Sequence, residues 1–235
     1  MNAKRGFVPE DERNFSPGAL ETMRKASRHI LYLINEGYDL KSAAAFAGNH
    51  FLLSERQRTA IMRSIGRSDR IRERIERKVP LADLAGREVW VDGFNTIITL
   101  EVMLSDSILL ECMDTSLRDL ASLRGTYRLI PQTERAVAMM LSLLEEAGVS
   151  GIHILLDAPV SNSGRLKSLI AGMGQGIPGL ETEVIKDVDR TLYDKDLVVT
   201  SDAIIMDHCG GWIGLTKECM KRLGMQGIRV WDREV

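Results

Sequence analysis

The amino-acid sequence predicts an α/β protein with a parallel sheet, preceded by an all-helical module, and two observations support this prediction. Up to about residue 80, apolar residues recur at helical spacing between capping and stop signals. From residue 87 on, short β-branched segments alternate with helical ones, which is typical of βαβ units. We therefore expect a helical module over residues 1–80 and an α/β domain over residues 81–235, with the boundary near Pro80.

Four helices are predicted in the helical module. Each starts at a side chain that can accept a hydrogen bond from a free backbone N–H, at Ser16, Asp39, Ser54 and Ser68. The third start has the clearest signal, because Ser54 and Gln57 have the spacing of a capping box. Gly37 and Gly66 can end the helices that precede them.

Strands and helices alternate in the second part. Strands are predicted at residues 88–92, 107–111, 152–157, 181–185, 197–200 and 228–231. Helices are predicted at residues 95–104, 132–147, 163–172 and 212–223, with a short helical turn at 202–208. Crossover connections of this kind are right-handed and join parallel strands, so we expect the strand ends to meet along one edge of the sheet.

Three of the predicted strands end in, or lead directly into, an aspartate: Asp92, Asp157 and Asp202. Ligands of open α/β sheets bind at the carboxyl ends of the strands, where these side chains would converge. A cluster of like charges is unfavourable unless a cation occupies it, and Mg²⁺ and Mn²⁺ prefer oxygen ligands. The sequence therefore predicts a Mg²⁺- or Mn²⁺-dependent site for phosphodiester chemistry, with these three aspartates as metal ligands.

Polar neighbours add to the predicted site. Asn95 lies three residues after Asp92, where it can orient the carboxylate or bind substrate, and we count it with the candidate catalytic residues. Thr200 and Ser201 place hydroxyl groups at a strand end, within reach of a metal-bound water or the scissile phosphate.

Each aspartate also has a structural alternative. Asp92 and Asp202 can cap the helices that follow them, and Asp157 can be a turn residue whose oxygens bond to backbone N–H groups. These alternatives leave no role for a metal.

Four further acids are weaker candidates. Glu101, on the helix after Asp92, either supports the metal ligands from behind or lies on a solvated face. Asp187 and Asp189 lie in a segment of alternating charge, which favours a self-paired loop. Asp207 follows the late aspartate by five residues.

Charge is distributed unevenly along the chain. Residues 1–80 carry 16 Lys and Arg against 10 Asp and Glu, whereas residues 81–235 carry 15 against 23. Five arginines at spacings of three and four residues would form one cationic stripe if two short helices were nearly continuous: Arg63, Arg67, Arg70, Arg74 and Arg77. Such a stripe can follow an RNA backbone, and an ordinary solvated surface is the competing interpretation.

Several functional classes are excluded because the sequence lacks their motifs. There is no GxxxxGK[ST] phosphate loop and no GxSxG nucleophile elbow. The second position after Asp92 is Phe94, which excludes the Asp-x-Asp pair of haloacid-dehalogenase-type enzymes. Without an apolar segment near its first residues or a long apolar stretch elsewhere, the chain is expected to be cytoplasmic, with no signal peptide and no membrane span.

Three short motifs carry a family resemblance: Val91-Asp92-Gly93-Phe94-Asn95, Leu156-Asp157 and Val199-Thr200-Ser201-Asp202. Over about 150 residues the chain resembles the PIN-like and NYN ribonuclease domains. The resemblance implies a Rossmann-like α/β/α sandwich in which Asp92, Asp157 and Asp202, helped by Asn95, hold Mg²⁺ or Mn²⁺. One position departs from the NYN pattern, because Ile204 stands where a second late acid is found and Asp207 is the nearest substitute.

The whole chain also resembles the archaeal family named for its domain of unknown function 434, through Arg56-Gln57-Arg58, Asp92-Gly93-Phe94-Asn95 and Leu100-Glu101. The leading hypothesis is a metal-dependent nuclease, specifically an endoribonuclease whose helical module positions RNA. The alternative is a non-catalytic RNA- or protein-binding module that keeps a nuclease-like fold, and a small-molecule phosphohydrolase is a third interpretation. A homo-oligomer or a protein partner is compatible with each of them.

Overall fold

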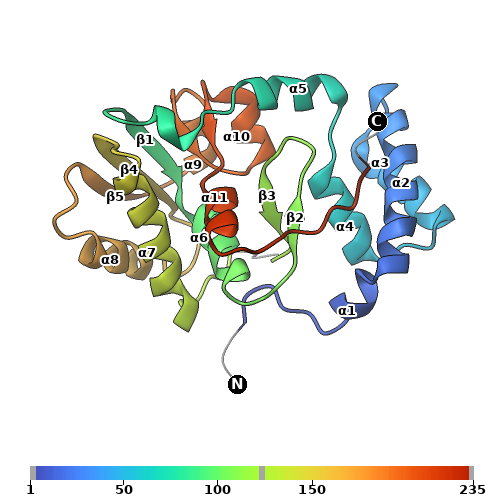
Figure 1. Ribbon diagram of the computed structural model, residues 1–235, viewed down its shortest axis with the longest axis horizontal. Coiled ribbons are helices and arrows are strands. Elements are labelled where there is room, and N and C mark those ends of the chain that lie inside the picture. The colour runs from blue at the N-terminus through green and yellow to red at the C-terminus, as the bar shows by residue number, and fades with distance from the viewer. Residues whose placement is uncertain (1–3, 122–124, 233–235) are drawn as a thin grey trace.

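Five parallel strands form the central sheet, in the spatial order β5-β4-β1-β6-β7 (Figure 1). The structure is a computed structural model and describes residues 4–121 and 125–232. The strands are β1 (Glu88–Asp92), β4 (Gly151–Asp157), β5 (Leu180–Ile185), β6 (Val198–Val199) and β7 (Trp212–Ile213). The chain runs outward from β1 to β4 and β5, then returns to the other side of β1 for β6 and β7. The strand order therefore reverses between β1 and β6.

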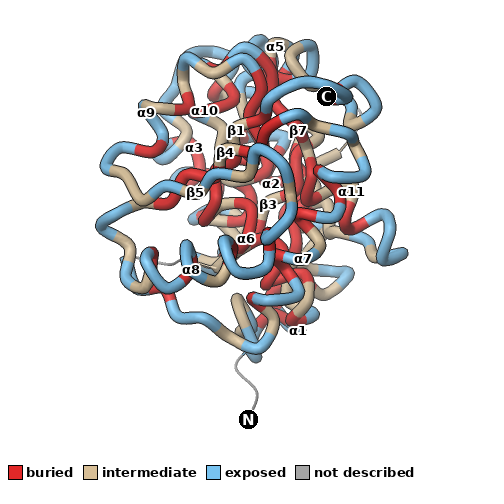
Figure 2. Tube along the Cα trace, turned by 90° about the vertical axis from the view of Figure 1, so that its left-hand side faces the viewer, coloured by how far each residue is buried: buried red, intermediate tan, exposed pale blue. Residues whose placement is uncertain are grey.

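Helices cover both faces of this sheet (Figures 1 and 2). The larger core, on one face, is formed with α6 (Gly93–Met103), α7 (Pro131–Glu146), α8 (Ser163–Met173) and α11 (Leu215–Arg222). The smaller core, on the other face, is formed with α9 (Val188–Leu192) and α10 (Ala203–His208). Because side chains alternate along a strand, Val89 and Val91 enter the larger core while Trp90 packs against the smaller one. Asp92 shares the face of Trp90.

The helical module contains α1 (Asp11–Asn14), α2 (Pro17–Asn35), α3 (Leu40–His50), α4 (Glu55–Ser64) and α5 (Ser68–Glu76), followed by the 3₁₀ turn η1 (Leu81–Asp83). The caps predicted at Asp39 and Ser54 are confirmed: Asp39 accepts a hydrogen bond from the Ser42 N–H at 2.8 Å, and Ser54 forms the capping box with Gln57. No helix in the described part of the chain is both long enough and apolar enough to cross a membrane.

The prediction that Ser68 caps the fourth predicted helix is wrong. Ser68 is the first residue of α5, and the capping position belongs to Arg67. The Ser68 N–H donates instead to the side chain of Asn35 on α2, at 2.9 Å. The side chain of Asn35, 33 residues away, thus accepts the hydrogen bond at the start of this helix, where sequence spacing predicts a local cap.

A hairpin outside the sheet links the two parts of the chain. Strands β2 (Leu109–Glu111) and β3 (Leu117–Asp119) pair antiparallel and lie between the sheet and the helical module (Figure 1). Leu110, Cys112 and Leu120 are buried in the core of the helical module, together with Ile30 and Ile61. The hydrophobic core of the first part is therefore completed by residues from the second.

The strands predicted at 88–92, 152–157, 181–185 and 197–200 are present to within one residue at each end. Three other predictions are corrected. The predicted strand 107–111 belongs to the hairpin, and the segment 228–231 makes only an isolated bridge, from Ile228 to Leu110. The predicted helix 212–223 begins three residues later, because Trp212 and Ile213 form the edge strand β7. Strands of two or three residues are too short to show the alternation of apolar and polar residues from which a strand is predicted.

Gly93 allows α6 to begin directly after β1. A Cβ atom at this position would lie 2.7 Å from the Leu155 carbonyl oxygen and 2.6 Å from a methyl group of Leu156, both on β4. No side chain fits there without moving the strand, so the glycine fixes how closely the start of the helix approaches the sheet.

Gly93→Ala is expected to destabilise the protein by about 1–3 kcal/mol or more, because the added methyl group meets backbone and a packed leucine. Gly164→Ala is the matched control: it also lies in a first helical turn, on α8, but nothing lies within 4 Å of its added Cβ. The free energy of unfolding, measured with urea, should fall for the first variant and stay equal or rise for the second. Equal effects would show that the approach at Gly93 is not tight.

Candidate active site

The candidate active site lies in the crevice between the carboxyl ends of β1 and β6, where the strand order reverses. Ligands of open α/β sheets bind at this kind of position. Asp92 ends β1, and Thr200, Ser201 and Asp202 follow β6 directly. The prediction that these strand ends meet at one edge is confirmed for β1 and β6 by hydrogen bonds between them.

Asp92 is the most deeply buried acid of this edge, with 5 % of its surface exposed. Thr200 Oγ1 donates to its Oδ2 at 2.9 Å. Its side chain makes no capping hydrogen bond to the start of α6, so the capping alternative does not describe it. The pKa of Asp92 is raised to about 8, mainly by burial and then by the charges of Asp202, Asp189 and Asp157, while the Thr200 hydrogen bond acts in the opposite direction.

The neighbouring acids act on one another through their charges. Asp157 ends β4, next to β1, and its pKa is raised by partial burial and by the charge of Asp189. The pKa of Asp189, on α9, is raised by partial burial and then by Asp202 and Asp187. Within residues 4–121 and 125–232, no ion pair joins Asp92, Asp157, Asp189 or Asp202 to a basic side chain. None of these four acids is thus neutralised by an ion pair in that part of the chain; we call these four residues the acidic cluster.

Asn95 holds the loop after β6 against the first turn of α6. Its Oδ1 accepts hydrogen bonds from Ser201 through both the backbone N–H, at 3.0 Å, and Oγ, at 2.8 Å. Thr200 Oγ1 accepts a bond from the Asp202 N–H at 3.0 Å while donating to Asp92. Asp92, Asn95, Thr200, Ser201 and Asp202 therefore form one bonded unit, in which Asn95 positions the loop through Ser201, whereas Asp157 is not part of it.

Asp202 caps α10, as its structural alternative predicts. Its Oδ1 accepts from the N–H groups of Ile204 and Ile205 at 2.8 and 3.2 Å. Both bonds use the same oxygen, and the charge of Asp202 also acts on Asp92. The capping role and a place in the acidic cluster are combined in one side chain.

The acidic cluster suits a hydrated cation better than an enclosed one. In the described residues, no three Asp, Glu, His or Cys side chains are grouped closely enough to hold a metal ion together. Carboxylate oxygens are nevertheless the ligands that Mg²⁺ prefers, and Mg²⁺ keeps several waters and needs only one or two carboxylates. By their chemistry, one or two carboxylates of the acidic cluster fit the needs of a largely hydrated cation.

A cavity of about 320 Å³ opens beside the acidic cluster, between the helical module and the α/β part. It is lined by Met62, Arg63, Asn95, Arg118, Asp119, Ser201, Asp202, Ala203 and Ile204. Three of these residues, Asn95, Ser201 and Asp202, belong to the bonded unit at the strand ends. Asp202 is the member of the acidic cluster that lines the cavity, and Asp92 lies behind it, bonded through Thr200 to the same loop.

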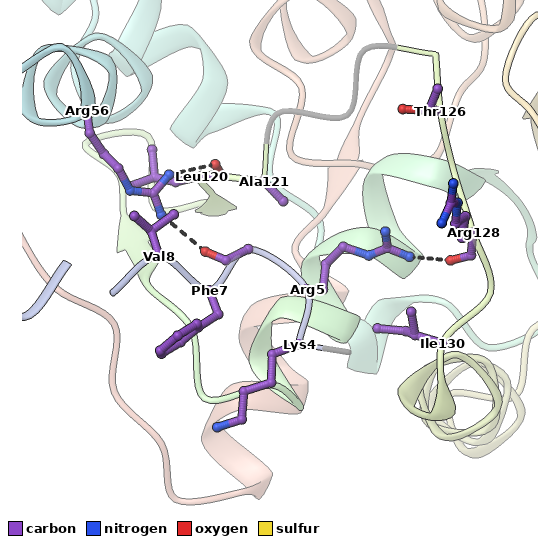
Figure 3. Close-up of a pocket in the computed structure, with 11 residues that line it drawn as sticks. Lys4, Arg5, Phe7, Val8, Arg56, Leu120, Ala121, Thr126, Arg128 and Ile130 are labelled. Carbon is purple, nitrogen blue, oxygen red and sulfur yellow. Dashed lines mark hydrogen bonds between the residues drawn. The ribbon is translucent and has the colours of Figure 1, made fainter. Parts of the chain in front are cut away.

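A larger cavity, of about 610 Å³, lies elsewhere, between the N-terminal segment, the end of the hairpin and residues 126–130 (Figure 3). Two of its three arginines, Arg5 and Arg56, are engaged in structural contacts. Arg56 donates to the Leu120 and Gly6 carbonyls, and Arg5 donates to the Arg128 carbonyl, as the dashed lines in Figure 3 show. It shares no residue with the acidic cluster, so we place the functional site at the smaller cavity.

Comparison with known proteins assigns both parts of the chain. Residues 81–218 match the family described as "Domain of unknown function (DUF5616)". The chain belongs to the DUF5616 family. Residues 22–77 match "Protein of unknown function (DUF434)", so the two matches meet beside Pro80. An uncharacterized protein of Methanocaldococcus jannaschii is 32 % identical over 187 residues, which cover 79 % of this chain and 89 % of that protein. No solved structure matches the chain.

All members of the acidic cluster lie in the DUF5616 part, but two acids predicted nearby do not join them. Glu101 is fully buried on α6 and pairs with Arg5 Nε at 2.8 Å. It also accepts hydrogen bonds from Tyr127 and Thr133, so it anchors the N-terminal segment and α7 and lies on no solvated face. Asp207 is bound through both oxygens by Arg74, at 2.6 and 2.9 Å.

The predicted arginine stripe of the DUF434 part is divided. Residue 65, between α4 and α5, is extended, so the helices are not continuous. Arg67 and Arg70 are exposed and pair with acids of their own helix. Arg74 is buried against α10, and Arg77 donates to the Asp207 carbonyl at 2.7 Å. Arg63 alone among the five lines the cavity beside the acidic cluster.

The sequence did not predict that Arg118, Asp114 and Arg74 form a buried group that supports the loop after β6. Arg118, on β3, donates through Nε to the Ser201 carbonyl at 2.7 Å and through Nη2 to Asp114 at 2.5 Å. Asp114 is fully buried, and Arg74 reaches it at 3.2 Å. These residues come from a short hairpin and a helix, so no local pattern announces that they meet.

Asp92→Asn is expected to stabilise the metal-free protein at alkaline pH. A raised pKa means that the folded protein keeps a proton which the unfolded chain releases, so this contribution to stability is present at low pH and is lost as pH rises to about 8. Asparagine mimics the protonated form at every pH. The melting temperature of the variant in chelator should be close to that of the native protein near pH 4, and its excess over the native protein should grow as pH rises to about 8. Parallel pH profiles would contradict the raised pKa.

Arg74→Ala is expected to destabilise the protein by about 3–5 kcal/mol, because it leaves Asp114 buried without one of its two cations. Arg70→Ala, on the same helix and exposed, should change stability by no more than about 0.5 kcal/mol. Urea unfolding of both variants measures the difference.

Proposed function

We propose that this protein is a metal-dependent nuclease, an endoribonuclease that hydrolyses phosphodiester bonds of RNA. One observation carries the proposal: Asp92 is buried at the end of the central strand among three further acids, and its pKa is raised to about 8. A folded protein that keeps such a carboxyl group without a basic partner gives up stability at neutral pH, which is a common property of functional sites.

The arrangement of the sheet supports a Rossmann-like, PIN-like fold. In chain order its strands read 3-2-1-4-5, which is the order of the Rossmann sheet up to its fifth strand. Asp92 and Asp157 lie on the same face, because the register pairs Asp92 with Leu155, two residues before Asp157. The bonded unit of Asn95, Thr200 and Ser201 agrees with the motifs that carry the resemblance.

Asp92 is the residue that would hold Mg²⁺ or Mn²⁺, and the charges of Asp157, Asp189 and Asp202, which already act on Asp92, would favour the cation. The cation would neutralise charge on the phosphodiester and lower the pKa of a water. The chain itself orients the groups: Thr200 holds one oxygen of Asp92, and Asn95 holds Ser201 at the edge of the cavity. Loss of the proton from Asp92 must accompany binding, because a protonated carboxyl group is a poor ligand.

RNA is favoured as substrate by the charge of the helical module, which carries 16 basic against 10 acidic residues up to residue 80. This module contributes Met62 and Arg63 to the cavity beside the acidic cluster. A helical module of net positive charge next to an acidic site suits a polyanionic substrate, because the module can neutralise phosphates while the acidic site performs hydrolysis.

A second candidate is a non-catalytic RNA- or protein-binding module on the same scaffold. Two observations favour it: Asp202 is used as a helix cap, and no three acids of the described chain are grouped as metal ligands. Such a protein would bind RNA equally well in Mg²⁺ and in chelator.

Asp92→Asn should abolish Mg²⁺- or Mn²⁺-dependent cleavage of a labelled RNA by the full chain. We expect a loss of more than about 100-fold, beyond the 10–100-fold typical of residues that only support a metal ligand. Asp83→Asn, an exposed acid on η1, is the matched control and should cleave normally. Cleavage that survives in Asp92→Asn or in chelator would refute the proposal.

The same proteins test cation binding without a substrate. Because Mg²⁺ competes with the proton on Asp92, it should raise the melting temperature of the native protein more at pH 8.5 than at pH 6.5. The Asp92→Asn variant should show no such shift. RNA binding without cleavage, combined with no effect of Mg²⁺ on melting, would establish the non-catalytic module instead.

A further inference from the structure

We infer that Arg63 of the helical module binds a substrate phosphate in the cavity beside the acidic cluster. This inference rests on the proposed function for its biological meaning, but its physical content is the recognition of a phosphate by one guanidinium group. It makes the helical module part of the site.

The position of Arg63 is fixed by backbone contacts between α4 and the hairpin. The Arg63 carbonyl accepts hydrogen bonds from Arg118 and Cys112 of the hairpin. The next carbonyl, of Ser64, accepts from the Met113 N–H at 2.8 Å. The last turn of α4 is thus attached to the element that also supports the loop after β6, so the Arg63 side chain has a defined starting point at the cavity wall.

The guanidinium of Arg63 is held at one end and accessible at the other. Its Nη1 donates to the Asp119 carbonyl at 2.5 Å, while 38 % of the side chain is exposed. A guanidinium carries five N–H donors in a planar fork, so one bond to a carbonyl leaves enough donors for a two-point contact with phosphate.

The two arginines of the cavity differ in how their charge is balanced. Arg118 is committed: each of its three nitrogens donates within the protein, and buried Asp114 neutralises its charge. Arg63 has only a loose ion pair, 3.7 Å from Asp119 Oδ1. The Asp119 carboxylate is itself occupied by Thr99 Oγ1 and the Ala121 N–H, both at 2.8 Å. Arg63 is therefore the cation of this cavity whose charge is available to an anion.

The rest of the cavity suits a nucleotide attached to that phosphate. Its volume of about 320 Å³ is at the lower end of the range of small-molecule sites. Met62 and Ile204 provide apolar surface, and Ile204 is 55 % exposed although it follows the acidic cluster directly. A phosphate held by Arg63 would place the neighbouring nucleotide beside Asn95 and Asp202. The class of ligand is a nucleic acid strand with an accessible, unpaired nucleotide.

The experiment measures the binding of a labelled single-stranded RNA oligonucleotide to the full chain by fluorescence anisotropy, in chelator, over a range of salt concentrations. Arg63→Ala should weaken binding roughly tenfold or more, as expected for hydrogen bonds to a charged group. It should also reduce the slope of log affinity against log salt by about 0.7, the value for one phosphate contact on a single strand. Arg72→Ala, an exposed arginine on α5, is the matched control.

Arg63→Lys keeps the charge without the planar fork, and an affinity between those of the native and alanine proteins would support a two-point contact. Its melting temperature, with that of Arg63→Ala, separates binding from folding. Equal effects of Arg63→Ala and Arg72→Ala on affinity and salt slope would overturn the inference.

Cleavage and Mg²⁺-induced melting shifts, measured on the same proteins, distinguish the two proposals. If the native protein shows both and Arg63→Ala loses no affinity, the phosphate contact is wrong and the nuclease proposal stands. If Arg63→Ala loses affinity but the native protein neither cleaves nor responds to Mg²⁺, the phosphate contact stands on a binding module. For an active enzyme, Arg63→Ala should raise KM for RNA more than it lowers kcat.

Discussion

The buried carboxylate of Asp114 holds the two parts of the molecule together. It is fully buried and binds Arg74 of α5 and Arg118 of β3. Burial alone would raise its pKa, but Arg118, Ser116 and Arg74 together hold the pKa below its usual value. Arg74 continues to Asp207 on α10, and Arg118 continues to the Ser201 carbonyl. One negative charge thus links the helical module, the hairpin and both sides of the loop that carries the candidate site.

The candidate site depends on this link because its own groups repel one another. The charges of Asp202, Asp189 and Asp157 raise the pKa of Asp92, and Asp189 and Asp202 act in the same way on Asp157 and on Asp189, respectively. Hydrogen bonds of hydroxyl and amide groups hold this edge of the sheet. A loop left to itself would relieve the repulsion by moving outward. The Arg118 bond to Ser201 and the Asn95 bonds to the same residue oppose that movement, so the loop stays against the end of β1.

The main features of the sheet and of its polar edge follow from the sequence. Alternating strand and helix segments are local patterns, and right-handed crossovers then place the carboxyl ends of the strands at one edge of the sheet. Asp92, Thr200 and Asn95 were predicted to lie together at the strand ends. The Thr200 hydrogen bond to Asp92 and the Ser201 hydrogen bond to Asn95 agree with that placement. Partners far along the chain were not predictable. Glu101 meets Arg5 across 96 positions and Arg74 meets Asp207 across 133, so their roles cannot be read from spacing.

The shared core has a consequence for how such a protein can arise and be divided. Leu110, Cys112 and Leu120 come from the hairpin, yet they are buried among the helices of the first eighty residues. A gene fragment that ended at the border between the two family matches would leave these side chains facing water on one product and an unfilled interior on the other. The segments that match the two families should therefore be inherited together, and recombination that joined either one to an unrelated domain should give a protein with an incomplete core.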